Sequence, residues 1–533
     1  MEMNVLTREK LNQLTQAEVI DIALGLLAQV NDLNAQNAFL TEQINLSNSR
    51  QFGRRSDQVD SNQLMFVFNE VEVTIADAPE EEPEVEEVVE SYKRKKKKAK
   101  GKRAEDLSGF SAQEIHHTIP EEELKEIFSG KYYRMPDEVY RKLKFNPASF
   151  EVEEHHIAVY SGKDADGGDR IVRAQRPAEL LKKSIVTPSL AAAVMNAKYV
   201  NAVPIYRLEQ EFRRMGLTLS RQVMSGWMLK LAERYLSLLY DRLRQELLES
   251  HVIHADETHV NVTKDGRKAG TQSYMWVYCS GDNRGIVLYD YQKTRRTDHP
   301  RAFLQNFGGT LVTDGYQVYH TLDRSSKSLK VAGCWAHARR KFTDILKAAK
   351  KSAGKDLTDS ISAVAISRIK HIYHTDGKLK DLSPDERKKE RDLTVRPLVE
   401  AYFEWVRVKL NEALESSELR KALDYSLNQE QYLKTFLDDP EIPLDNNLAE
   451  RAIRPFTVGR KNWNLIDTIH GAQASAILYS IAETAKSNNL KPYEYYRYLL
   501  EEIPKHMDDH DMDFLEDLLP WSNALPDACR GTK

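Results

Sequence analysis

Hydrophobic positions near the start of the chain alternate steps of four and three. From Val19 to Ile44 this spacing is that of a coiled-coil seam, and the lone Asn37 at an a position is a device that fixes register in parallel dimers. We expect a coiled-coil helix over 1–50, with an amphipathic helix packed on its own domain as the alternative. The seam positions are Val19, Ala23, Leu26, Val30, Leu33, Asn37, Leu40 and Ile44.

Beyond residue 250 the pattern changes to the alternation and short apolar runs of β-strands. In HVIHADETHVNV (251–262), successive side chains point to opposite faces, which separates Asp256 from Glu257. SYMWVYCSG (273–281) and GIVLYDYQ (285–292) predict two further strands. The three strands would form a meander, which is half of a mixed sheet.

Two shorter strands are expected after this meander. The apolar run in GTLVTDGYQVY (309–319) ends just before Asp314, so this acid is placed to project into a site. LKVAGCWAHARRKF (329–342) predicts a fifth strand that runs into a basic helix. Cys334 and His337 stand three apart, which suggests metal ligands, but two ligands do not make a zinc site, so we expect Cys334 and Trp335 to pack near the strand end.

Helical patterns occupy two other regions. PIYRLEQEFRRMGLTLSRQVMSGWMLKLAERY (204–235) predicts two helices with Gly216 near the turn and Ser220 as a cap. A helix-turn-helix and an ordinary helical hairpin fit this segment equally well. In the first case three arginines would meet phosphates: Arg213, Arg214 and Arg221.

LDNNLAERAIRP (444–455) predicts a helix of about two turns, because Asp445 is a good N-cap and Pro455 disfavours helical geometry in the residue before it. Taken alone, the acid Glu450 between basic neighbours would be a surface ion pair. A helical insertion is expected at about 345–440, where Ser383 begins a capping box. The insertion would either shape the path of a bound substrate or only enlarge the fold.

The charge of the chain is nearly balanced but poorly mixed. Lys and Arg count 77 against 81 acids, yet DAPEEEPEVEEVVE (77–90) is followed closely by KRKKKKAKGKR (93–103). Such blocks predict a disordered linker over 51–105. Three cysteines are too few for a disulfide framework, and neither a membrane span nor a signal-peptide pattern is present. We therefore expect a soluble, cytoplasmic protein of several domains.

Residues 106–175 predict a small domain, with strands on either side of the turn KDADGGD. Its histidines occur in pairs, but no cysteine stands at metal-ligand spacing, so we expect them to be solvated. They are His116, His117, His155 and His156.

Asp256, Asp314 and Glu450 would together suit divalent cations, because these bind carboxylate oxygens. Two such ions can activate the attacking oxygen and stabilise the leaving oxygen at a phosphodiester. Basic residues beside Glu450 would hold nucleic-acid phosphates: Arg451, Arg454, Arg460 and Lys461.

Six motifs resemble the catalytic domain of the insertion sequence 66 family of bacterial DNA transposases. They are HADET, TDGY, AGCWAHARRKF, DNNLAERAIRP, GRKNW and AILYSIAETAK. The N-terminal zipper that ends in FGRRSD and the MSGWM segment resemble the same family, so the likeness spans most of the chain.

The resemblance implies an α/β catalytic core with a ribonuclease-H-like mixed sheet and an Asp-Asp-Glu active site, here Asp256, Asp314 and Glu450. It further implies two Mg²⁺ ions, for which Mn²⁺ would substitute, and small accessory proteins of the same element. Further DNA-binding candidates on this reading are Arg54, Arg55, Arg221, His337, Arg340 and Lys341. The family's cysteine-rich zinc segment would fall at 106–175, which has no cysteine, so we expect no zinc there.

Pattern and resemblance together predict the domain order. It is a coiled-coil helix at 1–50, a charged linker at 51–105, a small domain at 106–175, a helical DNA-binding region at 176–245, the catalytic domain at 246–500 and a C-terminal tail at 501–533.

The predicted activity is DNA transposition, with cleavage at the element ends and strand transfer into target DNA. There are two alternatives: a two-metal nuclease that does not join strands, and an inactive DNA-binding remnant of a mobile element. Because two DNA ends must meet, we expect a homo-oligomer that forms through the coiled coil and is associated with the nucleoid.

Overall fold

The computed structural model describes residues 148–163, 169–174, 179–268, 270–353 and 360–531. These residues fall into two units, one ending at Ala174 and one covering 179–531. The predicted coiled coil, the charged linker, Arg54, Arg55 and most of the small domain lie outside the described residues.

The first unit contains the two strands that were predicted on either side of KDADGGD. β1 (Val159–Lys163) and β2 (Asp169–Arg173) pair antiparallel. Upstream of them, His155 and His156 are exposed, as expected for solvated histidines.

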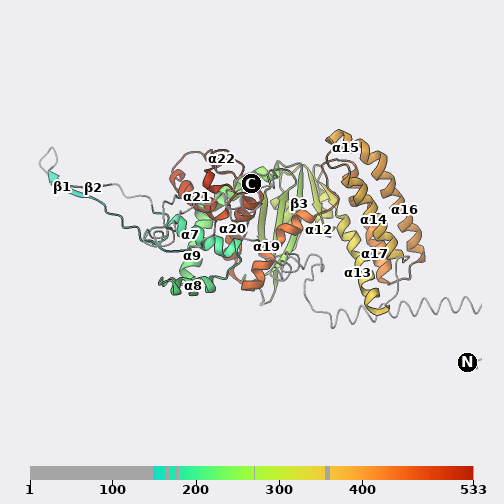
Figure 1. Ribbon diagram of the computed structural model, residues 1–533, viewed down its shortest axis with the longest axis horizontal. Helices are drawn as coiled ribbons and strands as arrows, with labels where there is room; N and C mark the ends of the chain where they lie inside the picture. Colours follow the sequence, from blue (N-terminus) through green and yellow to red (C-terminus); the bar gives the residue numbers. More distant parts are fainter. Residues whose placement is uncertain (1–147, 164–168, 175–178, 269, 354–359, 532–533) are drawn as a thin grey trace, which may run out of the picture. The chain divides into compact units, whose positions relative to one another are not determined.

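The second unit is built around a mixed sheet in the order β5-β4-β3-β6-β7 (Figure 1). β3, β4 and β5 form the predicted antiparallel meander, whereas β6 and β7 continue the sheet from β3 in parallel. A short strand, β8, pairs in parallel with the far end of β3. The bounds are β3 Val252–Lys264, β4 Gln272–Ser280, β5 Val287–Gln292, β6 Thr310–Thr313, β7 Lys330–Gly333 and β8 Ile466–Thr468.

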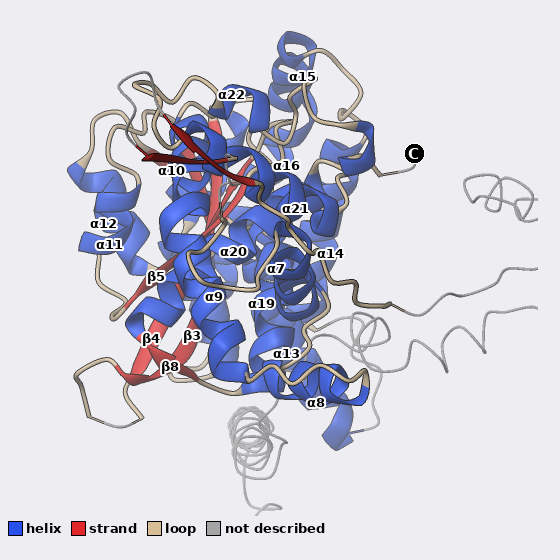
Figure 2. Cartoon of the chain, turned by 90° about the vertical axis from the view of Figure 1, so that its left-hand side faces the viewer, coloured by secondary structure: helices blue, strands red, loops and turns tan. Residues whose placement is uncertain are grey.

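Helices pack on both faces of this sheet (Figure 2). On one face the Tyr289 hydroxyl of β5 donates to the carbonyl of Ala452 in α19 (Asn447–Trp463). α20 (Ile469–Ser487) lies along the outer edge of β5, where the Ser480 hydroxyl accepts a hydrogen bond from the Tyr289 backbone N–H. On the other face, α11 (Asp298–Phe303) and α12 (Gln317–Ser325) contribute aromatic rings that contact β4. The strands are therefore shielded from water, which explains their long apolar runs.

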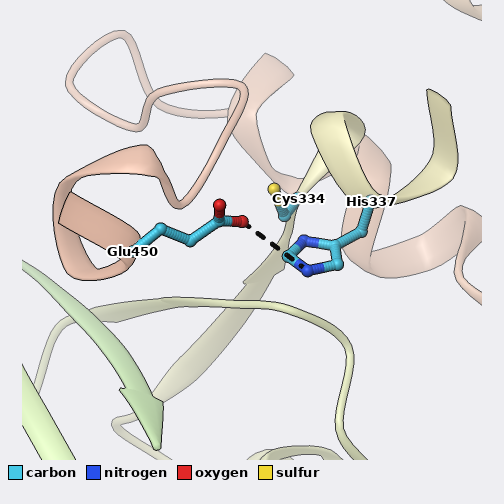
Figure 3. Close-up of side chains that lie close together, drawn as sticks. All are labelled: Cys334, His337 and Glu450. Carbon is cyan, nitrogen blue, oxygen red and sulfur yellow. Dashed lines mark ion pairs between the residues drawn. The ribbon is translucent and has the colours of Figure 1, made fainter. Parts of the chain in front are cut away.

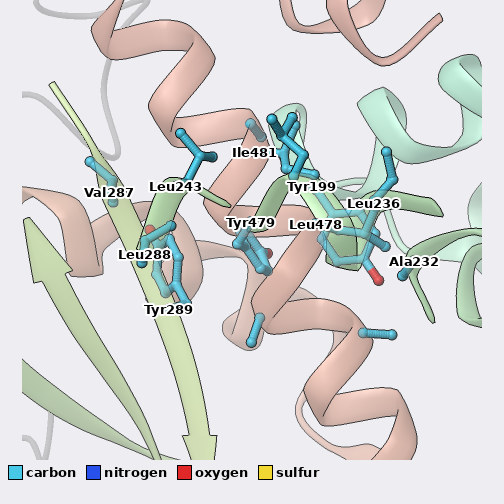
Figure 4. Close-up of a cluster of buried hydrophobic side chains, with 14 of the residues drawn as sticks. Tyr199, Ala232, Leu236, Leu243, Val287, Leu288, Tyr289, Leu478, Tyr479 and Ile481 are labelled. Atoms are coloured by element: carbon cyan, nitrogen blue, oxygen red, sulfur yellow. The ribbon is translucent and has the colours of Figure 1, made fainter. Parts of the chain in front are cut away.

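The main core lies between β5, α20 and the helices that precede the sheet. Figure 4 shows Tyr289, Tyr479 and Leu243 among its side chains, and each is at most 1% exposed. The preceding helices are α7 (Pro188–Met195), η1 (Asn196–Val200), α8 (Ile205–Arg214), α9 (Arg221–Leu231), η2 (Ala232–Leu236) and α10 (Ser237–Leu248).

α8 and α9 are the two helices predicted over 204–235. Gly216 has a φ of +90°, a backbone conformation that favours glycine, at the turn between them. Ser220 is the N-cap of α9, and its hydroxyl accepts a hydrogen bond from the Val223 N–H. The local prediction is therefore confirmed, while its use in DNA binding stays a prediction.

The described chain between β7 and α19 is helical and has a second core of its own, which includes Trp335, Phe342 and Tyr402. Ser383 and Glu386 form the predicted capping box. The elements are α13 (Trp335–Ala353), α14 (Ile361–Gly377), α15 (Pro384–Glu390), η3 (Arg391–Val395), α16 (Arg396–Glu412), α17 (Glu418–Asn428), α18 (Glu430–Lys434) and η4 (Thr435–Leu437).

The segment expected to be a tail packs against the protein. Leu515, Leu518 and Cys529 are buried, and the Cys529 carbonyl accepts a hydrogen bond from the Lys491 N–H. The elements are α21 (Pro492–Glu502), η5 (Ile503–His506), α22 (Leu515–Leu518) and η6 (Asp527–Cys529). In the part of the chain that is described, no helix is long and apolar enough to cross a membrane.

One predicted boundary is wrong. α19 does not end before Pro455 but continues through it to Trp463, and Asn446 rather than Asp445 is at the N-cap position. An internal proline costs about 3 kcal/mol. Phe456, the residue after it, is fully buried against an aromatic cluster, and such tertiary burial overrides the local preference.

Candidate active site

Asp256 and Asp314 come from neighbouring parallel strands. The register places His254 of β3 opposite Val312 of β6. Extending that register by two positions brings Asp256 level with Asp314, which directly follows β6. The sheet thus brings together the two acids that the sequence singled out, although 58 positions separate them (314 minus 256).

Both carboxylates are half-buried. In the described part of the chain each accepts a backbone hydrogen bond, Asp256 from the Glu257 N–H at 2.8 Å and Asp314 from the Tyr316 N–H at 2.9 Å, and neither pairs with a basic side chain. Burial raises the pKa of Asp256 well above its usual value, and the charges of Glu257, Asp314 and Glu450 raise it further. In the described structure these two strand acids therefore concentrate negative charge without a cationic side chain paired to either of them.

Glu257 points to the opposite face of β3, as predicted. Its side chain is 1% exposed and accepts hydrogen bonds from Arg295 and from the Tyr319 hydroxyl of α12, each at 2.7 Å. Burial, followed by the charge of Asp314, raises the pKa of Glu257, while Arg295 opposes this effect. Sequence reasoning missed Arg295 and Tyr319, which no local pattern connects to β3.

Asn446 attaches the start of α19 to the sheet. Its fully buried side-chain amide donates to the Ala255 carbonyl at 2.8 Å, and its side-chain oxygen lies 3.0 Å from His254 Nδ1. Its backbone N–H donates to the Cys334 sulfur at 3.2 Å. These contacts hold the start of α19 against Ala255 within β3 and against Cys334, which follows β7, and Glu450 lies one helical turn later. Sequence analysis overlooked Asn446, because it took Asp445 as the N-cap and so placed Asn446 inside the predicted helix.

Glu450 faces the first turns of α13 (Figure 3). Its carboxylate lies 3.6 Å from His337 Nε2 and 3.2 Å from an Arg340 nitrogen. Burial lowers the pKa of His337 and Arg340 lowers it further, whereas Glu450 and Asp314 act in the opposite direction. The imidazole is therefore kept mostly neutral, and Arg340 supplies the positive charge next to Glu450.

A compact group of possible metal ligands is also present. It consists of Cys334, His337 and Glu450, whose possible ligand atoms all lie within 4.8 Å of one another. Among the described residues, no other group of three His, Cys, Asp or Glu side chains is this compact. Asp256 and Asp314 are not members of it. Cys334 and Trp335 are 1% and 0% exposed, so they pack at the strand end as predicted. Burial raises the pKa of the Cys334 thiol to about 12.

The predicted basic residues that the structure describes fall into three sets: those beside the acids, those that line a separate cavity, and those exposed elsewhere. Arg340 pairs with Glu450, and Lys341 lies over the ring of Tyr425, whose hydroxyl donates to the Asp314 carbonyl. Arg460 donates to the Thr258 hydroxyl at 3.0 Å and to the His259 carbonyl. These residues border the acids.

Arg451 and Arg454 line a separate cavity of about 440 Å³ with Lys486 and Tyr199. Lys461 is exposed on α19. Arg221 is exposed at the start of α9, with its guanidinium 5.9 Å from the Tyr206 ring centroid, and does not border the acids.

Comparison with known proteins adds two close relatives and a family. An uncharacterized protein of Sinorhizobium fredii, y4qI, is 28% identical over 514 residues, which cover 93% of this chain and 90% of the relative. A second from that organism, y4jD, also uncharacterized, is 29% identical over 415 residues, covering 76% of this chain and 78% of the relative.

Three family models match the chain. One described as Transposase C of IS166 homeodomain matches residues 39–108, which lie outside the described residues. One described as IS66 C-terminal element matches residues 480–521. One described as Transposase IS66 family matches residues 183–474, more than half of the chain. The predicted resemblance is thereby confirmed, and the chain belongs to the IS66 family of transposases.

Proposed function

We propose that this protein is a DNA transposase that cleaves phosphodiester bonds at the ends of a mobile element and joins the freed 3′ ends to target DNA. Asp256, Asp314 and Glu450 are its catalytic acids in this proposal. The observation that carries it is the level placement of Asp256 and Asp314 on neighbouring strands, half-buried and without a cationic partner. The family membership gives the substrate class.

The sheet order supports a ribonuclease-H-like core. An antiparallel meander of three strands is followed by two parallel strands, and helices pack on both faces. One acid stands within the first strand and the next directly after the fourth, so the fold delivers them to one place.

The donor chemistry of these acids fits Mg²⁺. Hard divalent cations bind carboxylate oxygens. Burial and then the charges of the neighbouring acids raise the pKa of Asp256, and a bound cation would offset both effects by favouring the charged carboxylate. Asp256, Asp314 and Glu450 would hold the ions, which when bound activate the attacking oxygen and stabilise the leaving oxygen.

Other residues of the chain would orient the DNA and the acids. Asn446 keeps Glu450 beside the strand ends, so it is a positioning residue. Arg340, Lys341 and Arg460 border the acids and would hold phosphates next to the scissile bond. Away from the acids, the homeodomain match supports a role for residues 39–108, which include Arg54 and Arg55, in DNA recognition.

The deciding experiment incubates the full chain with end-labelled DNA from its element, target plasmid and Mg²⁺. Joined product supports the proposal, and replacing Mg²⁺ with EDTA should abolish it. Cut but unjoined DNA would indicate the nuclease alternative, and a bound, intact duplex would indicate the inactive remnant.

Assembly remains part of the proposal. Two element ends must be held together, which favours at least a dimer, and the seam over 1–50 would provide it. Light scattering of the full chain and of a chain starting near residue 105 tests this: two monomers would contradict the coiled coil. Accessory proteins and association with the nucleoid stay predictions.

A further inference from the structure

Cys334, His337 and Glu450 converge from three elements. Cys334 directly follows β7, His337 lies in the first turn of α13, and Glu450 lies in the first turn of α19; Figure 3 shows Glu450 and His337 pointing toward each other, with Cys334 beside them. Their ligand atoms lie within 4.8 Å of one another.

The donor set differs in kind from that of the proposed magnesium site. Sulfur, nitrogen and oxygen together suit Zn²⁺ and related transition-metal ions, whereas Mg²⁺ disfavours thiolate. Metal–ligand bonds of about 2.0–2.3 Å in a tetrahedral site place ligands about 3.3–3.8 Å apart. Side-chain shifts of about 1 Å would therefore complete the present arrangement.

Two further observations point to a ligand. His337 Nδ1 is buried and has no hydrogen-bond partner, although buried ring nitrogens are normally satisfied. The side chains of His337 and Glu450 are 19% and 18% exposed, so two of the three ligands are partly accessible to solvent. The Asn446 N–H on the Cys334 sulfur would act as an outer-shell hydrogen bond that orients this ligand.

We propose that Cys334, His337 and Glu450 form a three-ligand site for a Zn²⁺-class ion, and that occupation of this site withdraws Glu450 from the catalytic acids. On binding, the thiol releases its proton to solvent and the ion displaces Arg340 from Glu450. Binding itself is independent of the proposed function, whereas the inhibition rests on it. Excess Zn²⁺ would then inhibit cleavage that depends on Mg²⁺.

The binding test titrates the full chain, without DNA, with Co²⁺, which shares the preferences of Zn²⁺ and reports thiolate ligation by a sulfur-to-metal charge-transfer band. We expect a saturable band that Zn²⁺ abolishes. Cys334→Ser should eliminate it, and His337→Gln should weaken Co²⁺ binding by at least about 10–100-fold, the loss that removing only an outer-shell partner typically causes. Cys529→Ser, which removes another buried thiol, is the matched control and should leave the band unchanged.

Absence of the band in the wild-type chain, or its persistence in a folded Cys334→Ser variant, would overturn the site. His337→Gln provides a second test should Cys334→Ser fail to fold, because His337 is partly exposed; unchanged Co²⁺ affinity in this variant would equally reject the site.

The activity test measures Zn²⁺ inhibition of cleavage relative to the uninhibited rate of each variant. Cys334→Ser should require at least about tenfold more Zn²⁺ than the wild type or Cys529→Ser for half inhibition. Equal sensitivity would reject the inhibitory role. A chain that binds Co²⁺ through Cys334 but never cleaves DNA would refute the proposed function and leave the site intact.

Discussion

The two sides of the candidate active site are built by different means. Asp256 and Asp314 stand on or directly after adjacent strands, where backbone register fixes their relative height. Glu450 stands on α19, which a long helical region separates from β6 in the sequence and which reaches the sheet through Asn446. Backbone register thus fixes the positions of Asp256 and Asp314, whereas the side-chain contacts of Asn446 fix the position of Glu450.

The two strand acids and Glu450 also differ in their electrostatic surroundings. The strand acids accept only backbone hydrogen bonds in the described structure, and their repulsion is uncompensated. Glu450 is neutralised by Arg340 and lies beside His337. Asp256 and Asp314 could therefore bind a cation without losing another partner, whereas Glu450 must first give up its ion pair with Arg340. The following tests address this difference.

Removing a strand acid should have the largest effect. Asp256→Asn or Asp314→Asn keeps the shape and removes the charge, so DNA-end cleavage should fall about 10³-fold or more. Binding of the same DNA, measured by gel shift, should be nearly unchanged. Glu257→Gln is the neighbouring control on the opposite face of β3 and should lose far less activity. An equal loss in the control would contradict the assignment.

Removing the side-chain contacts of Asn446 at the start of α19 should lower both the free energy of unfolding and the activity. Asn446→Ala leaves the Ala255 carbonyl and His254 Nδ1 without their buried partner, which should reduce the free energy of unfolding by about 2–4 kcal/mol. Chemical denaturation measures this change. Asn447→Ala is the control, because the hydrogen bond to Asp445 uses the backbone N–H of Asn447. Similar losses in the two variants would show that Asn446 does not anchor α19.

Beyond Pro455, α19 approaches Tyr479 of α20 closely at Gly459. A Cβ at Gly459 would lie 2.3 Å from the Tyr479 hydroxyl oxygen, so Gly459→Ala should destabilise the protein by about 1–3 kcal/mol. Adding Tyr479→Phe should recover part of the loss in thermal unfolding. Gly226→Ala, where a Cβ meets nothing within 4 Å, should be neutral or slightly stabilising. No recovery in the double variant would argue against this contact.

The raised pKa of Asp256 predicts a smaller effect that depends on pH. The unfolded pKa is about 3.9, so the stability contributed by the protonated folded form is present below that pH and is lost as pH rises through the higher folded pKa. Without divalent ions, Asp256→Asn should therefore melt above the wild type at pH 7.5, by about 1–1.5 °C for each kcal/mol by which burial and repulsion disfavour the charged Asp256. The difference should vanish near pH 4.

Mg²⁺ provides the control for this prediction. It should raise the melting temperature of the wild type at pH 7.5 more than that of Asp256→Asn, because an ion that binds only the folded state stabilises it. Equal shifts in the two proteins would place the ion elsewhere.

Much of this molecule follows from local sequence. Alternating side chains predicted the meander and put Glu257 opposite Asp256, and the apolar run before Asp314 located the end of β6. The Ser220 cap and the Ser383 capping box were also predictable. These features depend on residues within about four positions of each other, so the pattern of the chain contains the necessary information.

Tertiary contacts decided the rest. Local rules ended α19 at Pro455, but burial of Phe456 carries the helix onward. The Asn446 anchor and the meeting of Cys334 with Glu450 join segments more than 100 positions apart. No spacing rule links such residues, because their proximity results from how helices pack on a completed sheet and not from the repeat of any single element.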